Sequence, residues 1–162
     1  MMLQNSQQTL IDEYGMNPFE VWVLNPKRTL CEKIMSLVRF SQTQEPIADL
    51  KNKIRHIYDI HLMLKNDHLR SFFQSDEFEK MLLRVANDDI TSFKNNNKWL
   101  ANHPTTAIVF SDPKDTWNKI KDVYTGSFSE LVFGKLPPET DILKKLTTVA
   151  DRLKSIEWSI KP

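Results

Sequence analysis

Residues 25–64 have the sequence NPKRTLCEKIMSLVRFSQTQEPIADLKNKIRHIYDIHLML, which predicts two helices joined by a short polar turn. Asn25 is a favourable N-cap, and Pro26 suits the first helical position, where its missing N–H costs nothing. Apolar residues then recur at helical spacing until the helix is expected to end near Ser41. The members of this apolar stripe are Leu30, Ile34, Leu37 and Val38, widened by Cys31 and Met35.

The second helix is expected to begin after Pro46 and to carry a long apolar stripe at steps of three and four residues. Arg55 and Asp59 lie one turn apart on its opposite face, at a spacing where side chains meet. Lys33 lies just outside the stripe of the first helix. Two interpretations of these charges are open: a surface ion pair worth roughly a few tenths of a kcal/mol, or a chemical site. The stripe of the second helix comprises Ile47, Leu50, Ile54, Ile57, His61 and Leu64.

Two runs of this region carry a family resemblance: VWVLNPKRTLCEKIMSLVRFS at residues 21–41 and KIRHIYDIHLML at residues 53–64. They resemble the C-terminal half of the AbiEii/AbiGii nucleotidyltransferase toxin family, which is similar to the DNA polymerase β-like nucleotidyltransferases. In that family, a helix with a Glu-Lys motif precedes a helix with the motif R-x-x-Y-D, and the lysine and aspartate flank the nucleotide site. A looser match includes the turn at Leu131–Pro137.

The resemblance implies roles for three residues. Lys33 of TLCEK and Asp59 of RHIYD match the family's catalytic lysine and aspartate, and Lys33 with Arg55 would bind the nucleotide. The implied reaction transfers a nucleotidyl group from an NTP, with Mg²⁺, to an acceptor such as tRNA. The implied setting is a toxin–antitoxin system acting in abortive infection, with an antitoxin protein and RNA as partners.

The sequence departs from the family pattern in its metal-binding part. Family members carry a Gly-Ser and a D-x-D pair, which bind the metal ions and the nucleotide phosphates. Here no Gly-Ser precedes the matching region, no D-x-D occurs anywhere, and the adjacent Asp88 and Asp89 have a different spacing. We therefore expect no metal ligands in this chain and no catalysis by it alone, as in a truncated relative, a fragment or one half of a split enzyme.

An alternative function is a non-catalytic helical interaction module that binds an antitoxin, a nucleic acid or a separate catalytic half; a third is a remnant without activity. The net charge of +1 argues against a general polyanion binder, yet residues 26–70 carry nine Lys and Arg against five Asp and Glu. This local excess suits a nucleotide triphosphate or an RNA backbone, and it is also common on solvated helix faces.

The expected fold is mainly α, a helical bundle with one or two short β-strands in a single domain over residues 1–162. Residues 1–25 are expected to be an N-terminal helix and strand remnant, and residues 26–162 the bundle. The strands are expected at Phe19–Leu24, which alternates strand-forming residues, and at Thr105–Phe110. Residues 87–102 are expected to be a mobile connection, either without regular structure or with one helical turn. The other helices are expected at 3–15, 68–73, 75–85, 113–126, 127–133 and 138–156.

The strand predicted at Phe19–Leu24 has apolar residues on both faces, and its unpaired edge is a template for pairing. It is expected to pair with Thr105–Phe110, with the N-terminal segment, or across a homodimer. We expect the homodimer, because the chain offers few other strands.

The cytoplasm is the default compartment for this composition. The single cysteine, Cys31, excludes an internal disulfide and a cysteine-based zinc site, and its apolar helix face predicts a buried thiol. No apolar run approaches the roughly 20 residues that a membrane helix needs, and the first residues lack signal-peptide features.

His56 and His61 lie on different helix faces and make a poor metal pair. The tryptophans are not interleaved with cations, as base-stacking residues are.

Overall fold

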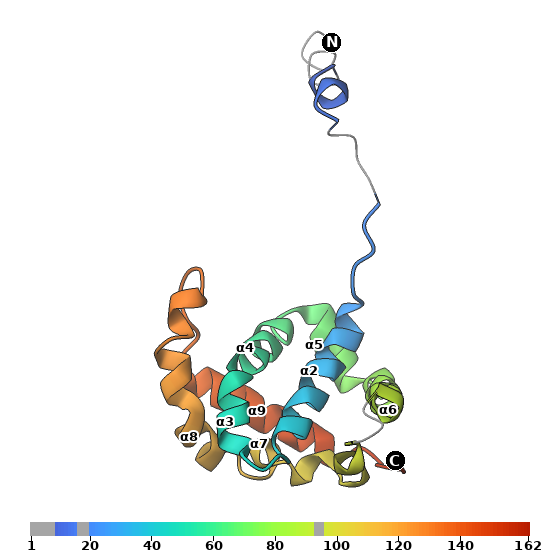
Figure 1. The fold of residues 1–162 in the computed structure, drawn as a ribbon, viewed down its shortest axis with the longest axis vertical. Helices are drawn as coiled ribbons and strands as arrows, with labels where there is room; N and C mark the ends of the chain where they lie inside the picture. The colour runs from blue at the N-terminus through green and yellow to red at the C-terminus, as the bar shows by residue number, and fades with distance from the viewer. Residues whose placement is uncertain (1–8, 16–19, 93–95) are drawn as a thin grey trace.

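The computed structural model describes residues 9–15, 20–92 and 96–162, whose arrangement is shown in Figure 1. These residues form helices, turns and loops without a β-strand, which confirms the mainly α fold. None of the described helices is long and apolar enough to cross a membrane. Residues 9–13 are helical. The other elements are α2 (Pro26–Phe40), α3 (Pro46–Asn52), α4 (Ile54–Met63), α5 (Asp67–Gln74), α6 (Asp76–Ser92), the 3-10 turns η1 (Lys98–Ala101) and η2 (Pro104–Thr106), α7 (Ile108–Ser111), α8 (Pro113–Thr125), η3 (Ser129–Leu131) and α9 (Glu139–Lys154).

Helix α2 is the central element of the bundle and contacts α3, α4, α5, α6 and α7. It begins as predicted, because the Asn25 side chain accepts a hydrogen bond from the Lys27 backbone N–H at 2.9 Å and Pro26 occupies the first turn. Burial of each large apolar side chain contributes roughly 1.5–3 kcal/mol before the entropy of ordering is subtracted. The predicted stripe is buried throughout: Leu30, Cys31, Ile34, Met35, Leu37 and Val38.

The second predicted helix is in fact two helices, because the chain leaves the helical conformation at Lys53, between α3 and α4. Lys53 has φ −106° and ψ 13°, and its N–H bonds back to the carbonyls of Leu50 and Lys51. The break lets α3 pack against α8 while α4 packs against α2 and α9. The predicted apolar stripe continues across the break, with Ile47 partly buried and Leu50, Ile54, Ile57, His61 and Leu64 buried.

Helix α6 extends further than the sequence predicts. It continues to Ser92, so the expected mobile connection is wrong over residues 87–92, while residues 93–95 lie outside the described part. The extra turns are stabilised because Ile90 packs against the core and the Asn87 side chain donates to the Leu83 carbonyl at 2.9 Å. After the gap, η1 buries Trp99 and Leu100.

The extended segment predicted at Thr105–Phe110 is wrong, since η2 and α7 occupy this part of the chain. The His103 ring accepts a hydrogen bond from the Thr105 backbone N–H at 3.2 Å, which starts the first turn. The helical conformation then packs α7 against α8 and α9 and buries Val109 and Phe110. A local cap and the core therefore favour helix over strand here.

The strand predicted at Phe19–Leu24 is wrong over residues 20–24, which have no secondary structure; Phe19 lies outside the described residues. The segment leads away from the bundle (Figure 1), and none of the described residues forms a strand beside it. Its apolar side chains are exposed, and Trp22 is 97% exposed. Pairing with residues 105–110 is therefore wrong as well, and so is pairing with the described N-terminal residues 9–13, which are helical. Pairing across a homodimer stays a prediction.

The turn between α8 and α9 projects from the bundle (Figure 1). Gly126 ends α8 as predicted, and glycine suits this position because a Cβ here would lie 2.8 Å from the Asp122 carbonyl oxygen. The helix predicted at 127–133 is limited to η3, and Gly134 follows with φ +90°, a conformation that side chains disfavour. The Tyr124 hydroxyl donates to the Pro137 carbonyl at 2.8 Å and so joins the two ends of the turn.

Candidate functional site

Lys33 and Asp59 meet between α2 and α4. The Lys33 Nζ donates to the Asp59 Oδ2 at 2.8 Å, and the two side chains are only 19% and 21% exposed. Because partial burial lowers the effective dielectric, this pair interacts more strongly than an exposed ion pair of the same length. The predicted approach of these two residues is confirmed, whereas their catalytic roles stay predictions.

Arg55 is the outer member of this cluster. Its Nε lies 3.7 Å from the same Asp59 Oδ2, and its side chain is 80% exposed. An exposed i,i+4 pair of this kind contributes little to stability. The surface-pair interpretation thus fits Arg55, while Asp59 is held by Lys33, and most of the donors of the Arg55 guanidinium face solvent.

His56 adds a neutral ring beside this cluster. Burial, reinforced by the nearby Lys33 and Lys53 charges, lowers the pKa of His56 to about 4. Its Nδ1 is buried and has no hydrogen-bond partner among the residues that the structure describes. At pH 7 the imidazole is therefore uncharged, and the positive charge next to Asp59 belongs to Lys33 and Arg55.

A cavity of about 220 Å³ opens beside Asp59. One wall consists of Arg55, Tyr58 and Asp59, which lie at i, i+3 and i+4 on one face of α4. The ring of Tyr58 meets the ring of Phe128 edge-to-face, with the centroids 5.2 Å apart, and this contact joins the two walls. The second wall belongs to the turn after α8 and consists of Phe128, Leu131, Val132 and Phe133.

Sequence reasoning did not find this second wall. Its residues are distant from Lys33 and Asp59 in the sequence, and no periodic pattern connects them. The one signal was the turn at Leu131–Pro137, which belongs to the looser part of the family pattern. A larger hollow of about 750 Å³, lined by Arg39, Lys98 and Trp99 among others, contains none of the predicted site residues.

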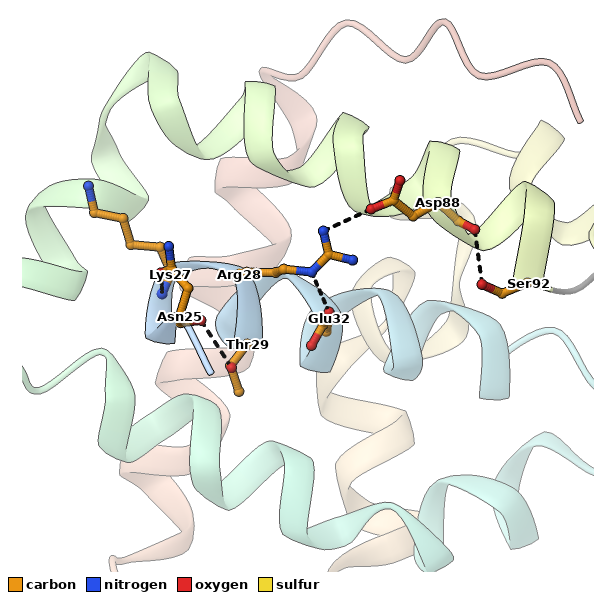
Figure 2. A network of polar contacts seen from close by, with 7 residues as sticks. All are labelled: Asn25, Lys27, Arg28, Thr29, Glu32, Asp88 and Ser92. Atoms are coloured by element: carbon orange, nitrogen blue, oxygen red, sulfur yellow. Dashed lines mark hydrogen bonds and ion pairs between the residues drawn. The ribbon is translucent and has the colours of Figure 1, made fainter. Parts of the chain in front are cut away.

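The acidic pair Asp88 and Asp89 does not form a metal site with other ligands. Figure 2 shows Arg28 between α2 and α6, where its Nη1 binds the Asp88 Oδ2 at 2.8 Å and its Nε binds the Glu32 Oε1 at 2.7 Å. Burial raises the pKa of Asp89 to about 6. Within the described residues, no three His, Cys, Asp or Glu side chains lie close enough together to hold a metal ion.

A comparison with models of protein families matches residues 4–152 to the family described as nucleotidyl transferase AbiEii toxin, type IV toxin–antitoxin system. The matched region includes Lys33, Arg55 and Asp59 and both walls of the cavity. Comparisons with curated proteins and with solved structures gave no match.

Proposed function

Because the chain belongs to the AbiEii family of nucleotidyl transferase toxins, we propose that Lys33, Asp59 and Arg55 are the nucleotide-contacting part of a nucleotidyl-transfer site. The observation that carries this proposal is the 2.8 Å bond between Lys33 and Asp59, because it joins the two family motifs across separate helices. The donor in this proposal is an NTP, the acceptor is an RNA such as tRNA, and the protein partner is an antitoxin.

Each member of the cluster has a distinct role in the proposed site. Lys33 contacts the triphosphate as a point charge and stabilises the negative charge that builds up on the leaving phosphates. Asp59 orients the Lys33 ammonium group or the acceptor, and Arg55 holds Asp59 from the solvent side. The neutral His56 ring leaves Lys33 as the cation on the inner side of the cluster.

Metal ions held by carboxylates align and activate the attacking and leaving oxygens in reactions of this kind. The 162 residues contain no D-x-D pair, and the Asp59 carboxylate already binds Lys33. The proposal therefore assigns no metal-dependent step to these residues. We expect nucleotidyl transfer to require carboxylates beyond those of this chain.

Triphosphate affinity tests the role of Lys33. Lys33→Met should weaken NTP binding by about tenfold, because a charge-assisted contact to phosphate is lost. The matched control is Lys51→Met, since the Lys51 Nζ makes a comparable interhelical pair with Asp122 at 2.7 Å and lies outside both family motifs. If calorimetry gives the two variants the same affinity, the proposed role of Lys33 is wrong.

Incorporation of labelled nucleotide tests the expectation about catalysis. Purified chain supplied with an NTP, Mg²⁺ and RNA should incorporate none, because the D-x-D pair that the family uses to hold metal does not occur in its sequence. Incorporation that disappears in the Asp59→Ala variant would overturn this expectation and would mean that another acid of the chain binds metal.

A second candidate function is a non-catalytic helical module that binds an antitoxin, a nucleic acid or a separate catalytic half. The observation that favours it is the exposed apolar segment at residues 21–24. This function depends on that segment and not on Lys33, so Lys33→Met should leave partner binding unchanged. A variant with charges at Val21 and Val23 should lose the partner while keeping NTP affinity.

A further inference from the structure

The cavity beside Asp59 has exposed apolar residues at its rim. Phe133 is fully exposed, and Leu131 is largely exposed, although both line the same cavity as Arg55 and Asp59. We propose that this cavity binds a single unpaired nucleobase, stacked against Phe133 and Arg55. The inference rests on the proposed nucleotidyl-transfer site and adds a base-binding element to its phosphate contacts.

The turn that carries Phe133 is anchored to the bundle. The Phe128 ring stacks on the Tyr124 ring with centroids 5.9 Å apart, and the Tyr58 ring contacts Phe128 from α4. The Tyr124 hydroxyl also bonds to the Pro137 carbonyl at 2.8 Å. These contacts fix the two ends of the turn, and Phe133 lies between them.

The lining of the cavity matches the surfaces of a nucleobase. An aromatic ring and a guanidinium plane both stack on base faces. The Asp59 carboxylate binds Lys33 and Arg55 through Oδ2, while its Oδ1 has no hydrogen-bond partner in the part of the chain that the structure describes. This oxygen can therefore accept an N–H from a base edge. The volume of about 220 Å³ suits one flat ring system better than a whole nucleotide.

One wall of the cavity carries a cation. Arg55 lines it, and Lys33 lies behind it, bound to the Asp59 carboxylate, while the exposed Lys135 follows Phe133 by two positions in the sequence. A charged surface with an aromatic platform is the usual arrangement for binding single-stranded nucleic acid. The sequence does not show this arrangement, because Arg55 and Phe133 are adjacent only in the folded chain.

Fluorescence of 2-aminopurine, a base analogue that is quenched by stacking, tests the inference. The probes are 2-aminopurine riboside, its triphosphate, and a short single-stranded RNA that ends in 2-aminopurine. At least one probe should be quenched saturably by the intact chain. Phe133→Ala should weaken this binding by about tenfold, as loss of one stacking partner does, and Phe133→Trp should retain it. Trp22→Ala is the matched control, because Trp22 is similarly exposed and lies outside the cavity.

The three probes distinguish whether the bound base belongs to the donor nucleotide or to the acceptor RNA. Quenching of the triphosphate alone assigns the cavity to the base of the donor nucleotide, and quenching of the RNA alone assigns it to the acceptor; both support the inference. The inference is overturned if no probe is quenched at millimolar concentration or if Phe133→Ala binds as tightly as the intact chain. Leu131 and Phe133 would then be a surface for a protein partner.

The riboside also separates this inference from the proposed function. It carries no phosphate, so Phe133→Ala should weaken its binding more than Lys33→Met does, since Lys33 acts on the base only through its bond to Asp59. If Lys33→Met has no effect on triphosphate affinity and Phe133→Ala still weakens binding, the role proposed for Lys33 fails and the base site stands. The reverse result rejects the base site and keeps the phosphate contact.

Discussion

At the scale of single residues, two lysine–aspartate pairs have similar lengths but different surroundings. Lys33 and Asp59 are 2.8 Å apart, and Lys51 and Asp122 are 2.7 Å apart. The Asp122 side chain is mostly exposed, so water screens its charge, whereas Asp59 is mostly shielded. Bond length alone therefore does not identify a site. Shielding, the adjoining cavity and the family motif distinguish Lys33 and Asp59.

His56 should make the stability of the bundle depend on pH. Its pKa is about 4 in the folded chain against 6.5 for an ordinary histidine. The unfolded chain thus binds more protons between these values, so stability is lost as the pH falls from about 6.5 towards 4. His56→Gln should reduce this loss by about 1–2 kcal/mol, a range that allows for partial solvent screening. Chemical denaturation at pH 7.5 and pH 4.5 measures the difference.

His68→Gln is the control for this prediction, because His68 is an exposed histidine on α5. A difference between the two variants assigns the effect to the buried ring of His56. Part of the dependence should persist in His56→Gln, since burial also lowers the pKa of His61. Equal pH dependence of His56→Gln and the intact chain would show that His56 is as accessible to protons in the folded state as in the unfolded one.

At the scale of helices, local patterns predicted the fold where they agreed with packing. The Asn25 cap and the α2 stripe were predictable because one helix face supplies most of the local core. The break at Lys53 was not, because the apolar period continues through it and only the different partners of α3 and α4 require it. The prediction of a strand at Thr105–Phe110 was wrong because β-branched residues can also be buried in a helical turn.

Only some contacts of the candidate site could be predicted from the sequence. Arg55 and Asp59 share one helix, so their spacing indicated a contact. The contact between Lys33 and Asp59 could be inferred only by combining the two helix faces with the family motif. Phe128 and Phe133 could not be placed at all, because their position depends on how the turn after α8 folds back towards α4.

Arg152 of α9 should be a strong link between helices. Its Nε donates to the Phe73 carbonyl at 3.0 Å and its Nη2 donates to the Ser75 carbonyl at 3.1 Å, at the C-terminal end of α5. Its guanidinium also lies over the Phe78 ring, 5.2 Å from the centroid. Arg152→Leu should lower the free energy of unfolding by about 2–3 kcal/mol, because charge-assisted bonds are lost and carbonyls are left unpaired. Urea denaturation measures this change.

Arg28→Leu is the matched control for Arg152→Leu. Arg28 also connects two helices, but its partners Glu32 and Asp88 are exposed carboxylates (Figure 2), so its loss should cost less than about 1 kcal/mol. Arg152→Lys should recover only part of the stability, because an ammonium group lacks the planar fork that reaches both carbonyls. Equal losses at Arg28 and Arg152 would argue against the carbonyl contacts as the source.

At the scale of the whole molecule, the helices from residue 26 onward share one core, and the described residues before them, 9–15 and 20–25, contribute no side chain to it (Figure 1). Residues 21–24 contribute no side chain to that core. A row of exposed apolar residues with unpaired backbone groups favours association with another polypeptide. A second copy of the chain is the partner that the purified protein itself supplies.

We therefore expect purified chain to form a homodimer through residues 21–24. Val21→Lys combined with Val23→Lys should give a monomer, because two buried like charges at the contact would have to lose their hydration. The helical circular dichroism should not change, since both side chains are exposed in the single chain. Leu62→Lys, at an exposed apolar residue of α4, should leave the dimer intact. Sedimentation at micromolar concentration measures all three proteins, and a monomeric intact chain, or a double variant that remains dimeric, would exclude this segment as the dimer contact.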